Sequence, residues 1–408
     1  MAEFIYFSGA NNNCSKYSAN KISKSRILFT VLFLFCVFFF GNAKVFSQLQ
    51  IVDQATWNQF VLEVENNLSA GQIYELMVDV GIGDPSSPDF IDTVRSPIGG
   101  VFRGNFNGGN NRIIVNITDD STNVGLFRFV EGGQIDSLTL EGYVVGGSST
   151  RTLGAFAGRV IGGSFYHCKN LASVTGDNRF DTLFIGGIAG YVGFLASPMK
   201  PIYASDNILK YCENNGFLSN GSDIGGIIGV AGLCRTVVSI SYSNNSGTLQ
   251  NATNSAGGIL GRVRYCCRFI TVEGVVNIGN ILTCDASYVG GLAGYFSTDG
   301  ENPSRITASK NSGLVAGATI AVGGLVGYLG AGIPNVSAEI TRSINTNWVD
   351  SGAATHFGAI VGYNNGRVDS CYYDKQMCIL GGINNRDSID VAEGKYTVEM
   401  TNNSLMSC

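Results

Sequence analysis

The heptapeptide Val322-Gly323-Gly324-Leu325-Val326-Gly327-Tyr328 decides the fold of this 408-residue chain, because variants of it recur along most of the sequence. The copies align on a leading glycine: Gly125, Gly154, Gly186, Gly225, Gly257, Gly290, Gly323 and Gly358. Successive leading glycines are 29, 32, 39, 32, 33, 33 and 35 residues apart. Periods of about 20 to 50 residues are typical of solenoids, in which each repeat is one structural unit that stacks on the next.

The segments between the glycine motifs alternate apolar and polar residues, as in residues 164–168 and 237–242. Such alternation, bounded by Gly, Asn and Ser, predicts strands, and no helical period persists through a repeat. A β-propeller is the structural rival, but its blades usually need about 40 residues or more. We therefore predict an all-β parallel β-helix of about eight to nine coils, roughly 40 Å long at ~4.8 Å per coil.

An asparagine recurs once in each of six repeats, at Asn170, Asn214, Asn245, Asn277, Asn311 and Asn345. A glycine stands two positions after it in four copies: Gly216, Gly247, Gly279 and Gly313. In one interpretation the side-chain amides stack from coil to coil and hydrogen-bond one another at a turn. In the other, each asparagine only adopts a left-handed backbone conformation at a bend. The sequence leaves both open.

Both ends of the repeat region differ from the repeats. Residues 54–66 place Trp57, Phe60, Val61 and Val64 at the spacing of an amphipathic helix, which suits a lid over the open end of a solenoid core. We expect an N-terminal cap with this helix and the first strands over residues 48–96, and β-helix repeats over 97–378. Residues 379–408 lose the repeat and are expected to form a C-terminal cap or a truncated tail.

The N-terminus is typical of an export signal. Four basic residues precede an apolar run over residues 27–40, interrupted by Thr30, and small residues follow it. This pattern predicts a signal peptide over residues 1–47, with an uncleaved signal anchor as the alternative. Residues 1–47 contain five basic residues and one acidic residue, so the mature chain would carry 21 basic and 30 acidic residues.

The composition excludes several function classes. The acidic balance argues against nucleic acid as a partner, because phosphate binding needs a basic excess. We expect membrane contact only through the N-terminal signal segment. His167 and His356 are the two histidines, no C-x-x-C pair exists, and we therefore expect neither a metal site nor a cofactor. Most of the cysteines are expected to be small buried apolar residues.

No catalytic residues can be assigned from the sequence, and we expect the chain not to be an enzyme. The acidic residues of the coils are scattered, and none recurs at one repeat offset. The pair Asp119-Asp120 is read as a solvated loop, and Arg262, Arg264 and Arg268 as a basic stripe on the surface. The alternative function is a polysaccharide lyase or hydrolase on a β-helix scaffold, which would need paired carboxylates on adjacent coils.

Several motifs together resemble the GLUG repeat of bacterial surface proteins. They are G-G-L-V-G-Y at residues 323–328 followed by N-x-G, F-R-G-N-F-N-G-G-N at residues 102–110, and C-Y-Y-D-K-Q at residues 371–376. The second motif departs from the family pattern at Asn107, where Asp is usual. The resemblance covers roughly residues 49–400. It implies a right-handed β-helix in an exported, often adhesin-like, bacterial protein with no shared catalytic residues.

These features predict a structural or adhesive protein, secreted or on the outer cell surface, that binds an unknown glycan or a host or cell-surface protein. Loops on a rigid scaffold are the usual place for recognition. The longest insertion lies between Gly193 and Asn207, where the period lengthens to 39 residues. Its candidate contact residues are Phe194, Pro198, Lys200, Pro201 and Tyr203.

Overall fold

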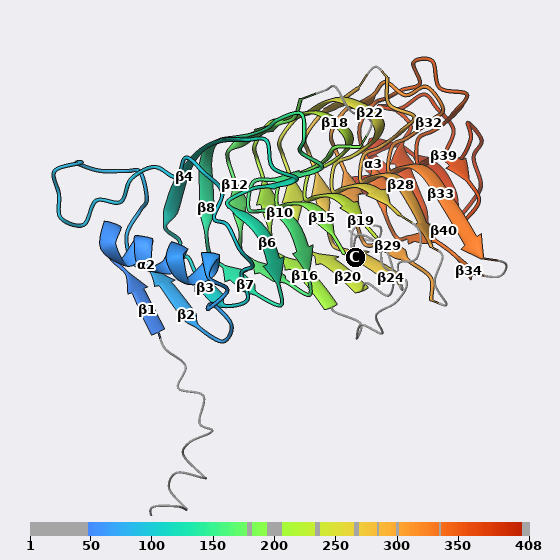
Figure 1. The fold of residues 1–408 in the computed structure, drawn as a ribbon. Coiled ribbons are helices and arrows are strands. Elements are labelled where there is room, and N and C mark those ends of the chain that lie inside the picture. The colour runs from blue at the N-terminus through green and yellow to red at the C-terminus, as the bar shows by residue number, and fades with distance from the viewer. Residues whose placement is uncertain are drawn as a thin grey trace, which may run out of the picture. The chain divides into compact units, whose positions relative to one another are not determined.

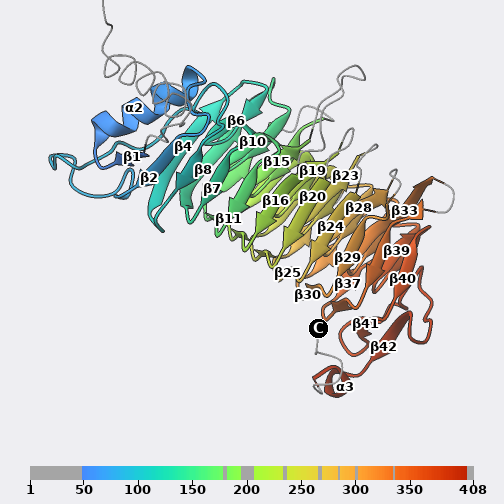
Figure 2. The same cartoon turned by 90° about the horizontal axis from the view of Figure 1, so that it is seen from below.

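The structure is a computed structural model that describes residues 48–177, 182–193, 206–232, 237–264, 269–283, 285–298, 302–333 and 336–401. This part of the chain is nearly all β and forms a parallel β-solenoid of about eight turns (Figure 1). Figure 2 shows the coils from a second side, stacked one behind the next. The predicted fold class is thereby confirmed. The right-handed sense of winding stays a prediction, in keeping with the strong preference of parallel β-crossovers.

Each coil contributes strands to three sheets, named A, B and C. Sheet A has eleven strands, in the order β1 (Gln48–Ile51), β2 (Ile73–Leu76), β3 (Asn105–Asn107), β7 (Gln134–Asp136), β11 (Ser164–Tyr166), β16 (Asp206–Lys210), β20 (Val237–Ser241), β24 (Phe269–Glu273), β29 (Arg305–Thr307), β35 (Glu339–Thr341) and β40 (Arg367–Asp369). Sheet C consists of β6 (Phe127–Glu131), β10 (Ala157–Ile161), β15 (Ala189–Val192), β19 (Ile228–Ala231), β23 (Leu260–Val263), β28 (Ala293–Thr298), β33 (Val326–Ile333) and β34 (Val336–Ser337), with β39 (Val361–Asn364) also paired to β33.

Sheet B carries two or three short strands from most coils. Its members are β4 (Arg112–Asp119), β5 (Asn123–Val124), β8 (Thr139–Gly146), β9 (Thr152–Gly154), β12 (Lys169–Asn170), β13 (Ser173–Thr175), β14 (Phe184–Gly186), β17 (Glu213–Asn214), β18 (Leu218–Gly225), β21 (Asn244–Asn245), β22 (Leu249–Gly257), β25 (Val276–Asn277), β26 (Ile281–Leu282), β27 (Tyr288–Gly290), β30 (Lys310–Asn311), β31 (Val315–Ala316), β32 (Ala321–Gly323), β36 (Ile344–Asn345), β37 (Val349–Asp350), β38 (His356–Gly358), β41 (Cys371–Asp374) and β42 (Ala392–Lys395). Neighbouring coils pair in parallel and in register, for example Asn214 with Asn245 and Gly225 with Gly257.

The core is a set of apolar columns that run along the stack. In sheet A one inward column passes from coil to coil with each residue paired to the next: Tyr74, Phe106, Ile135, Phe165, Leu209, Ile240, Val272, Ile306, Ile340 and Val368. All of them are buried. Because strand side chains alternate between the two faces, their neighbours in the strand point outward.

The repeated asparagines form a hydrogen-bonded ladder inside the solenoid. The side-chain Nδ2 of each donates to Oδ1 of the next along Asn170, Asn214, Asn245, Asn277, Asn311 and Asn345, at 2.7, 2.6, 2.8, 2.8 and 2.9 Å. Each Nδ2 also donates to the carbonyl two residues further along its own turn, at 2.9 to 3.2 Å. All six side chains are fully buried, so these contacts replace the water that the amides lose.

The left-handed residue of each turn is a different one. It lies three positions before the ladder asparagine, at His167, Tyr211, Tyr242, Ala308 and Arg342, with φ between 49° and 57°. Gly274 takes the same place in its own coil, with φ 61°. Of the two interpretations of the asparagines, the structure therefore has the ladder geometry, and the bend lies next to it.

The glycine motif lies across the narrow interior from this ladder. A Cβ atom on Gly258 would lie 2.3 Å from Cγ of Asn277 and 2.3 Å from the carbonyl oxygen of Gly291. The N-x-G glycine is equally confined, since a Cβ on Gly247 would lie 2.0 Å from the carbonyl oxygen of Gly216. Contacts this short exclude any side chain, so the backbone corner and the stacked amides together require glycine at these places.

A helix closes the N-terminal end of the core. It is α2 (Gln54–Glu65), and its N-cap is Asp53, whose side chain accepts from the backbone N–H of Thr56 at 2.8 Å. Trp57, Phe60 and Val64 are buried, as the spacing predicted, and the Phe60 ring packs against those of Tyr74, Phe102, Phe106 and Phe127. Val61 is only partly buried.

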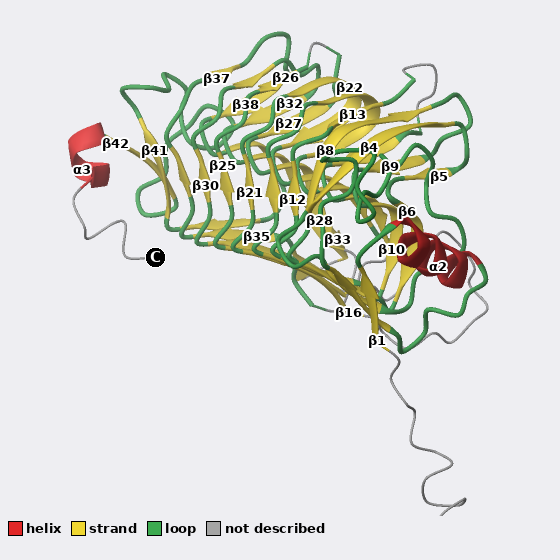
Figure 3. Cartoon of the chain, turned by 90° about the vertical axis from the view of Figure 1, so that its left-hand side faces the viewer, coloured by secondary structure: helices red, strands yellow, loops and turns green. Residues whose placement is uncertain are grey.

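The other end has a smaller cover. Residues 379–401 add β42 beside β41 and end in α3 (Thr397–Thr401), at the opposite end of the stack from α2 (Figure 3). Ile383 forms a further bridge to Val361 of sheet C. The described part of the predicted C-terminal segment therefore lies against the last coil.

Replacing Asn245 by Ala removes two ladder hydrogen bonds and leaves the Gly247 carbonyl without its amide partner. We expect the free energy of unfolding to fall by about 3 kcal/mol, measured by urea denaturation, because the remaining buried amides lose their partners. Asn215→Ala is the matched control, because Asn215 is exposed and its side-chain oxygen accepts a hydrogen bond from the hydroxyl of Ser246, outside the ladder. Equal effects of the two substitutions would contradict a stabilising role of the ladder.

Gly258→Ala tests the steric side of the same contact. The new methyl group would overlap the Asn277 amide, and we expect a loss of stability of about 3 kcal/mol or more, or failure to fold. Gly132→Ala provides the comparison: its φ is 68°, yet nothing lies within 4 Å of an added Cβ, so only about 1 kcal/mol of backbone strain is expected. Thermal unfolding midpoints of the two variants measure the difference, and a milder effect at position 258 would refute the argument.

Candidate binding surface

The outward face of sheet A is flat and mostly polar. Its strands present Ser164 and Tyr166 on β11, Ile208 and Lys210 on β16, Ser239 and Ser241 on β20, Arg305 and Thr307 on β29, and Glu339 and Thr341 on β35. These side chains alternate with the buried column, so the apolar spacing that builds the core also places them in rows on the surface.

A shallow hollow of about 410 Å³ lies on this face, across β16 and β20. It is lined by Tyr166, Asp206, Asn207, Ile208, Lys210, Val237, Ser239 and Ser241. Asn207 is buried, and its side chain donates to the carbonyl of Val237 at 3.0 Å and accepts from the N–H of Gly162 at 2.7 Å. Asn207, at the floor of the hollow, is therefore hydrogen-bonded to the coil on each side of it.

The lining combines several kinds of chemistry. Tyr166, Ile208 and Val237 supply half-buried apolar surface, and Ser239 and Ser241 supply hydroxyl groups. Asp206 and Lys210 stand at the two ends of β16, about 13 Å apart along an extended strand. A ligand that has apolar patches, hydroxyl groups and a polar substituent suits such a surface, as a sugar or a peptide does.

Lys210 is the cation of this site. Its Nζ lies 4.9 Å from the ring centre of Tyr211 and 5.7 Å from that of Tyr242. Within the described residues it forms no ion pair with a carboxylate. The cation–π contacts orient the ammonium group at the rim of the hollow, where no carboxylate of the described residues pairs with it.

The two tyrosines belong to a column of stacked rings beside the hollow. His167, Tyr211 and Tyr242 stack with ring centres 5.1 and 5.5 Å apart and planes within 21° of each other. They occupy the left-handed turn position of successive coils. Tyr242 next extends over Gly274, where an added Cβ would lie 2.9 Å from the ring. Each ring in this column therefore covers part of a face of its neighbour.

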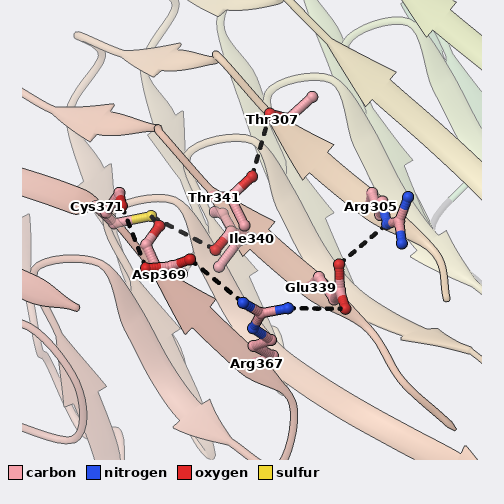
Figure 4. A network of polar contacts seen from close by, with 9 residues as sticks. Arg305, Thr307, Glu339, Ile340, Thr341, Arg367, Asp369 and Cys371 are labelled. Atoms are coloured by element: carbon pink, nitrogen blue, oxygen red, sulfur yellow. Dashed lines mark hydrogen bonds and ion pairs between the residues drawn. The ribbon is translucent and has the colours of Figure 1, made fainter. Parts of the chain in front are cut away.

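Further along sheet A the charged side chains pair with one another (Figure 4). Nε of Arg305 lies 3.0 Å from a carboxylate oxygen of Glu339, and Nη1 of Arg367 lies 3.7 Å from the other. Arg367 also pairs with Asp369 at 3.4 Å, while the hydroxyl groups of Thr341 and Thr307 are 3.1 Å apart. Charge on this part of the face is balanced internally, unlike that of Lys210.

The residues predicted as candidate contacts, Phe194, Pro198, Lys200, Pro201 and Tyr203, lie outside the described residues. Their segment is joined in the chain to Asp206, which lines the hollow. The predicted ladder asparagines and repeat glycines lie in the interior or at the corners of the coils, where they build the scaffold.

The remaining acidic and basic candidates are separate from one another. Asp119 pairs with Arg128 at 3.0 Å, whereas Asp120 accepts from the hydroxyl of Ser149. Nδ1 of His167 lies 3.2 Å from Asp136, and Nδ1 of His356 lies 3.3 Å from the Asn384 side-chain oxygen. Each of these contacts joins two residues and is separate from the others, so the described candidates do not converge on one site.

The basic stripe predicted for Arg262, Arg264 and Arg268 needs correction. Arg268 lies outside the described residues. Arg262 and Arg264 are partly buried, and their guanidinium groups lie over the rings of Tyr295 and Phe184 at 4.9 and 4.8 Å. Both face the fully buried Asp223; burial raises the pKa of that carboxyl, and the charge of Arg262 opposes the rise. The arginines compensate a buried acid, which their sequence spacing did not reveal.

The described cysteines Cys168, Cys212, Cys371 and Cys378 are buried free thiols. Burial raises the pKa of the Cys371 thiol to about 12, and burial with the neighbouring Cys212 raises that of Cys168. A reactive cysteine needs the opposite shift. No group of three or more His, Cys, Asp or Glu residues in the described ranges could hold a metal ion. None of the helices among those residues combines the length and apolarity needed to cross a membrane.

Sequence reasoning missed the hollow and the stacked rings. The rings could have been found from the repeat, since His167, Tyr211 and Tyr242 each stand three positions before a ladder asparagine. No repeat pattern predicts the hollow, because its lining residues come from three successive coils that are separated by unequal numbers of residues.

No protein-family model matches the chain, and no curated protein matches it. A crystal structure from Bacteroides ovatus, described as a "putative immunoglobulin A1 protease", is similar over 71% of this chain and 80% of its own, with 16% sequence identity and a TM-score of 0.41.

Proposed function

We propose that the mature chain is an exported structural or adhesive solenoid, secreted or on the outer cell surface, that binds a glycan or a protein through the hollow on sheet A. The observation that carries the proposal is the lining of this hollow: an aromatic ring, aliphatic side chains, hydroxyl groups and the Lys210 ammonium, which no described carboxylate pairs, gather on one sheet. Polar groups that converge beside apolar surface are typical of ligand sites.

Two features of the sequence support the same proposal. The apolar run over residues 27–40 behind a basic segment favours export. The insertion that lengthens one repeat to 39 residues leads directly into Asp206 at the edge of the hollow. The resemblance to GLUG repeat proteins favours an adhesin-like role.

A polysaccharide lyase or hydrolase is the second candidate. Hydrolysis of a glycosidic bond uses two carboxyl groups on either side of the bond. Among the described residues that line the hollow, one carries a carboxyl group, Asp206, so the required second carboxyl group is missing from this lining. The site therefore favours binding over catalysis, and a screen of uronate polysaccharides for unsaturated products would test for a lyase.

Binding is tested on an array of glycans and host proteins with the mature chain and two variants, Tyr166→Ala and Lys210→Ala. We expect each substitution to weaken binding about tenfold, because an aromatic contact or a charged hydrogen bond is lost. Thr307→Ala is the matched control, since Thr307 follows Lys210 in the same outward row three coils away. Deletion of residues 194–204 tests the candidate contact loop.

If both variants bind as the mature chain does and their thermal unfolding is unaltered, the hollow is not the binding site. A mature chain that binds nothing on the array would refute the proposed function itself.

A further inference from the structure

A second outward surface runs along sheet B. In each coil it consists of the residue that comes immediately before a member of a buried apolar column. The buried residues Val144, Val174, Leu218, Leu249, Ile281, Val315 and Val349 are paired from coil to coil. The residues preceding them share one register position and face outward. We call these residues the Phe217 strip: Tyr143, Ser173, Phe217, Thr248, Asn280, Leu314 and Trp348.

The aromatic members of the strip are exposed. Tyr143, Phe217 and Trp348 expose 42%, 40% and 41% of their surface. Single exposed aromatic residues are common, but here three share one register position in a solenoid. A row of this kind gives a linear ligand several equivalent contacts.

The rings of the strip also differ from the other aromatic columns of the molecule. Tyr295, Tyr328 and Tyr363 of sheet C stack with ring centres 4.4 and 5.2 Å apart and planes within 4° of each other. The rings beside the hollow also stack, at larger distances and angles. Tyr143, Phe217 and Trp348 make no ring–ring or cation–ring contact within the described part of the chain. Phe217 lies between the short side chains of Ser173 and Thr248, so another ring does not cover its faces.

The spacing of the rings follows the coils. Tyr143 and Phe217 are two coils apart, about 10 Å at ~4.8 Å per strand. Phe217 and Trp348 are four coils apart, about 19 Å on the same scale. A sugar residue in an extended polysaccharide advances the chain by about one such strand spacing, so rings two and four coils apart can contact the same chain.

The charge around the strip decides which polysaccharide fits. The parallel outward column on one side consists of Glu141, Leu171, Asn215, Ser246, Ile278, Ser312 and Thr346. The column on the other side consists of Val145, Thr175, Ser219, Gln250, Leu282, Ala316 and Asp350. Glu141 and Asp350 are the charged members, and both are acidic. The two columns therefore offer no cation to a carboxylate or sulfate, and the Ser, Thr and Asn side chains suit neutral hydroxyl groups.

We propose that the Phe217 strip binds an uncharged polysaccharide that lies extended along the solenoid, with sugar rings packed on Phe217 and Trp348. The apolar C–H face of a pyranose covers the exposed aromatic face, while the intervening Ser173, Thr248 and Asn280 hydrogen-bond its hydroxyl groups. This surface is distinct from the hollow on sheet A, and its ligand carries no charge.

The test uses affinity electrophoresis of the mature chain in gels that contain hydroxyethyl cellulose, glucomannan or the acidic polygalacturonate. We expect retardation by at least one neutral polymer and none by polygalacturonate. Phe217→Ala and Trp348→Ala should each weaken binding about tenfold, and Phe217→Trp should retain it. Tyr363→Ala is the matched control, because Tyr363 is similarly exposed at 37% but stacks on Tyr328.

Retardation by polygalacturonate alone, or by no polymer, would overturn the inference. So would equal losses in the Tyr363 and Phe217 variants, or concentration-dependent self-association of the chain that Trp348→Ala abolishes. The proposed function is judged separately. If binding depends on Tyr166 and Lys210 but not on Phe217 and Trp348, the strip fails and the hollow stands.

Discussion

The buried contact between the asparagine ladder and the glycine corner sets the geometry of the whole solenoid. Each ladder amide between Asn170 and Asn345 is hydrogen-bonded to the amides above and below it and to a carbonyl of its own turn. Across the interior, Gly226 and Gly258 approach the amides of Asn245 and Asn277 so closely that no side chain fits. A change in register between two coils would break the ladder bond and the glycine contact that join them, and a buried amide without a partner is costly. The ladder therefore specifies in-register stacking more strictly than apolar columns alone.

In-register stacking has a direct consequence for the surface. Residues at one repeat position form straight rows, and a row of like side chains becomes an extended feature. Two rows of aromatic rings stack on themselves, one through Tyr211 and one through Tyr328, and so add cohesion between coils. A third row carries rings that are not stacked, with small polar residues between them. The same repeat thus produces both structural contacts and open binding surfaces, depending on whether adjacent coils carry rings or short side chains.

The two candidate surfaces differ in chemistry. The hollow on sheet A has the Lys210 ammonium at its rim, beside aliphatic and hydroxyl groups, whereas the strip on sheet B has no cation beside it and follows the long direction of the stack. Such an arrangement suits a protein that holds an extended partner along its length and a second group at one place on its side. A rigid solenoid needs little rearrangement to bind in this way, which lowers the entropic cost of association.

The sequence by itself determined the period, the all-β class, the helix over residues 54–65 and the asparagine positions, because each follows from a local rule that repeats about every 33 residues. It left open whether the asparagines form a ladder or a bend, and the tertiary structure decided this by placing left-handed backbone three residues earlier, at Tyr211 and its equivalents. The hollow, the placement of two arginines near Asp223 and the unstacked rings depend on which side chains meet between coils. Those contacts join residues about 30 to 40 positions apart, with variable loop lengths between them, so only the stacked structure brings them together.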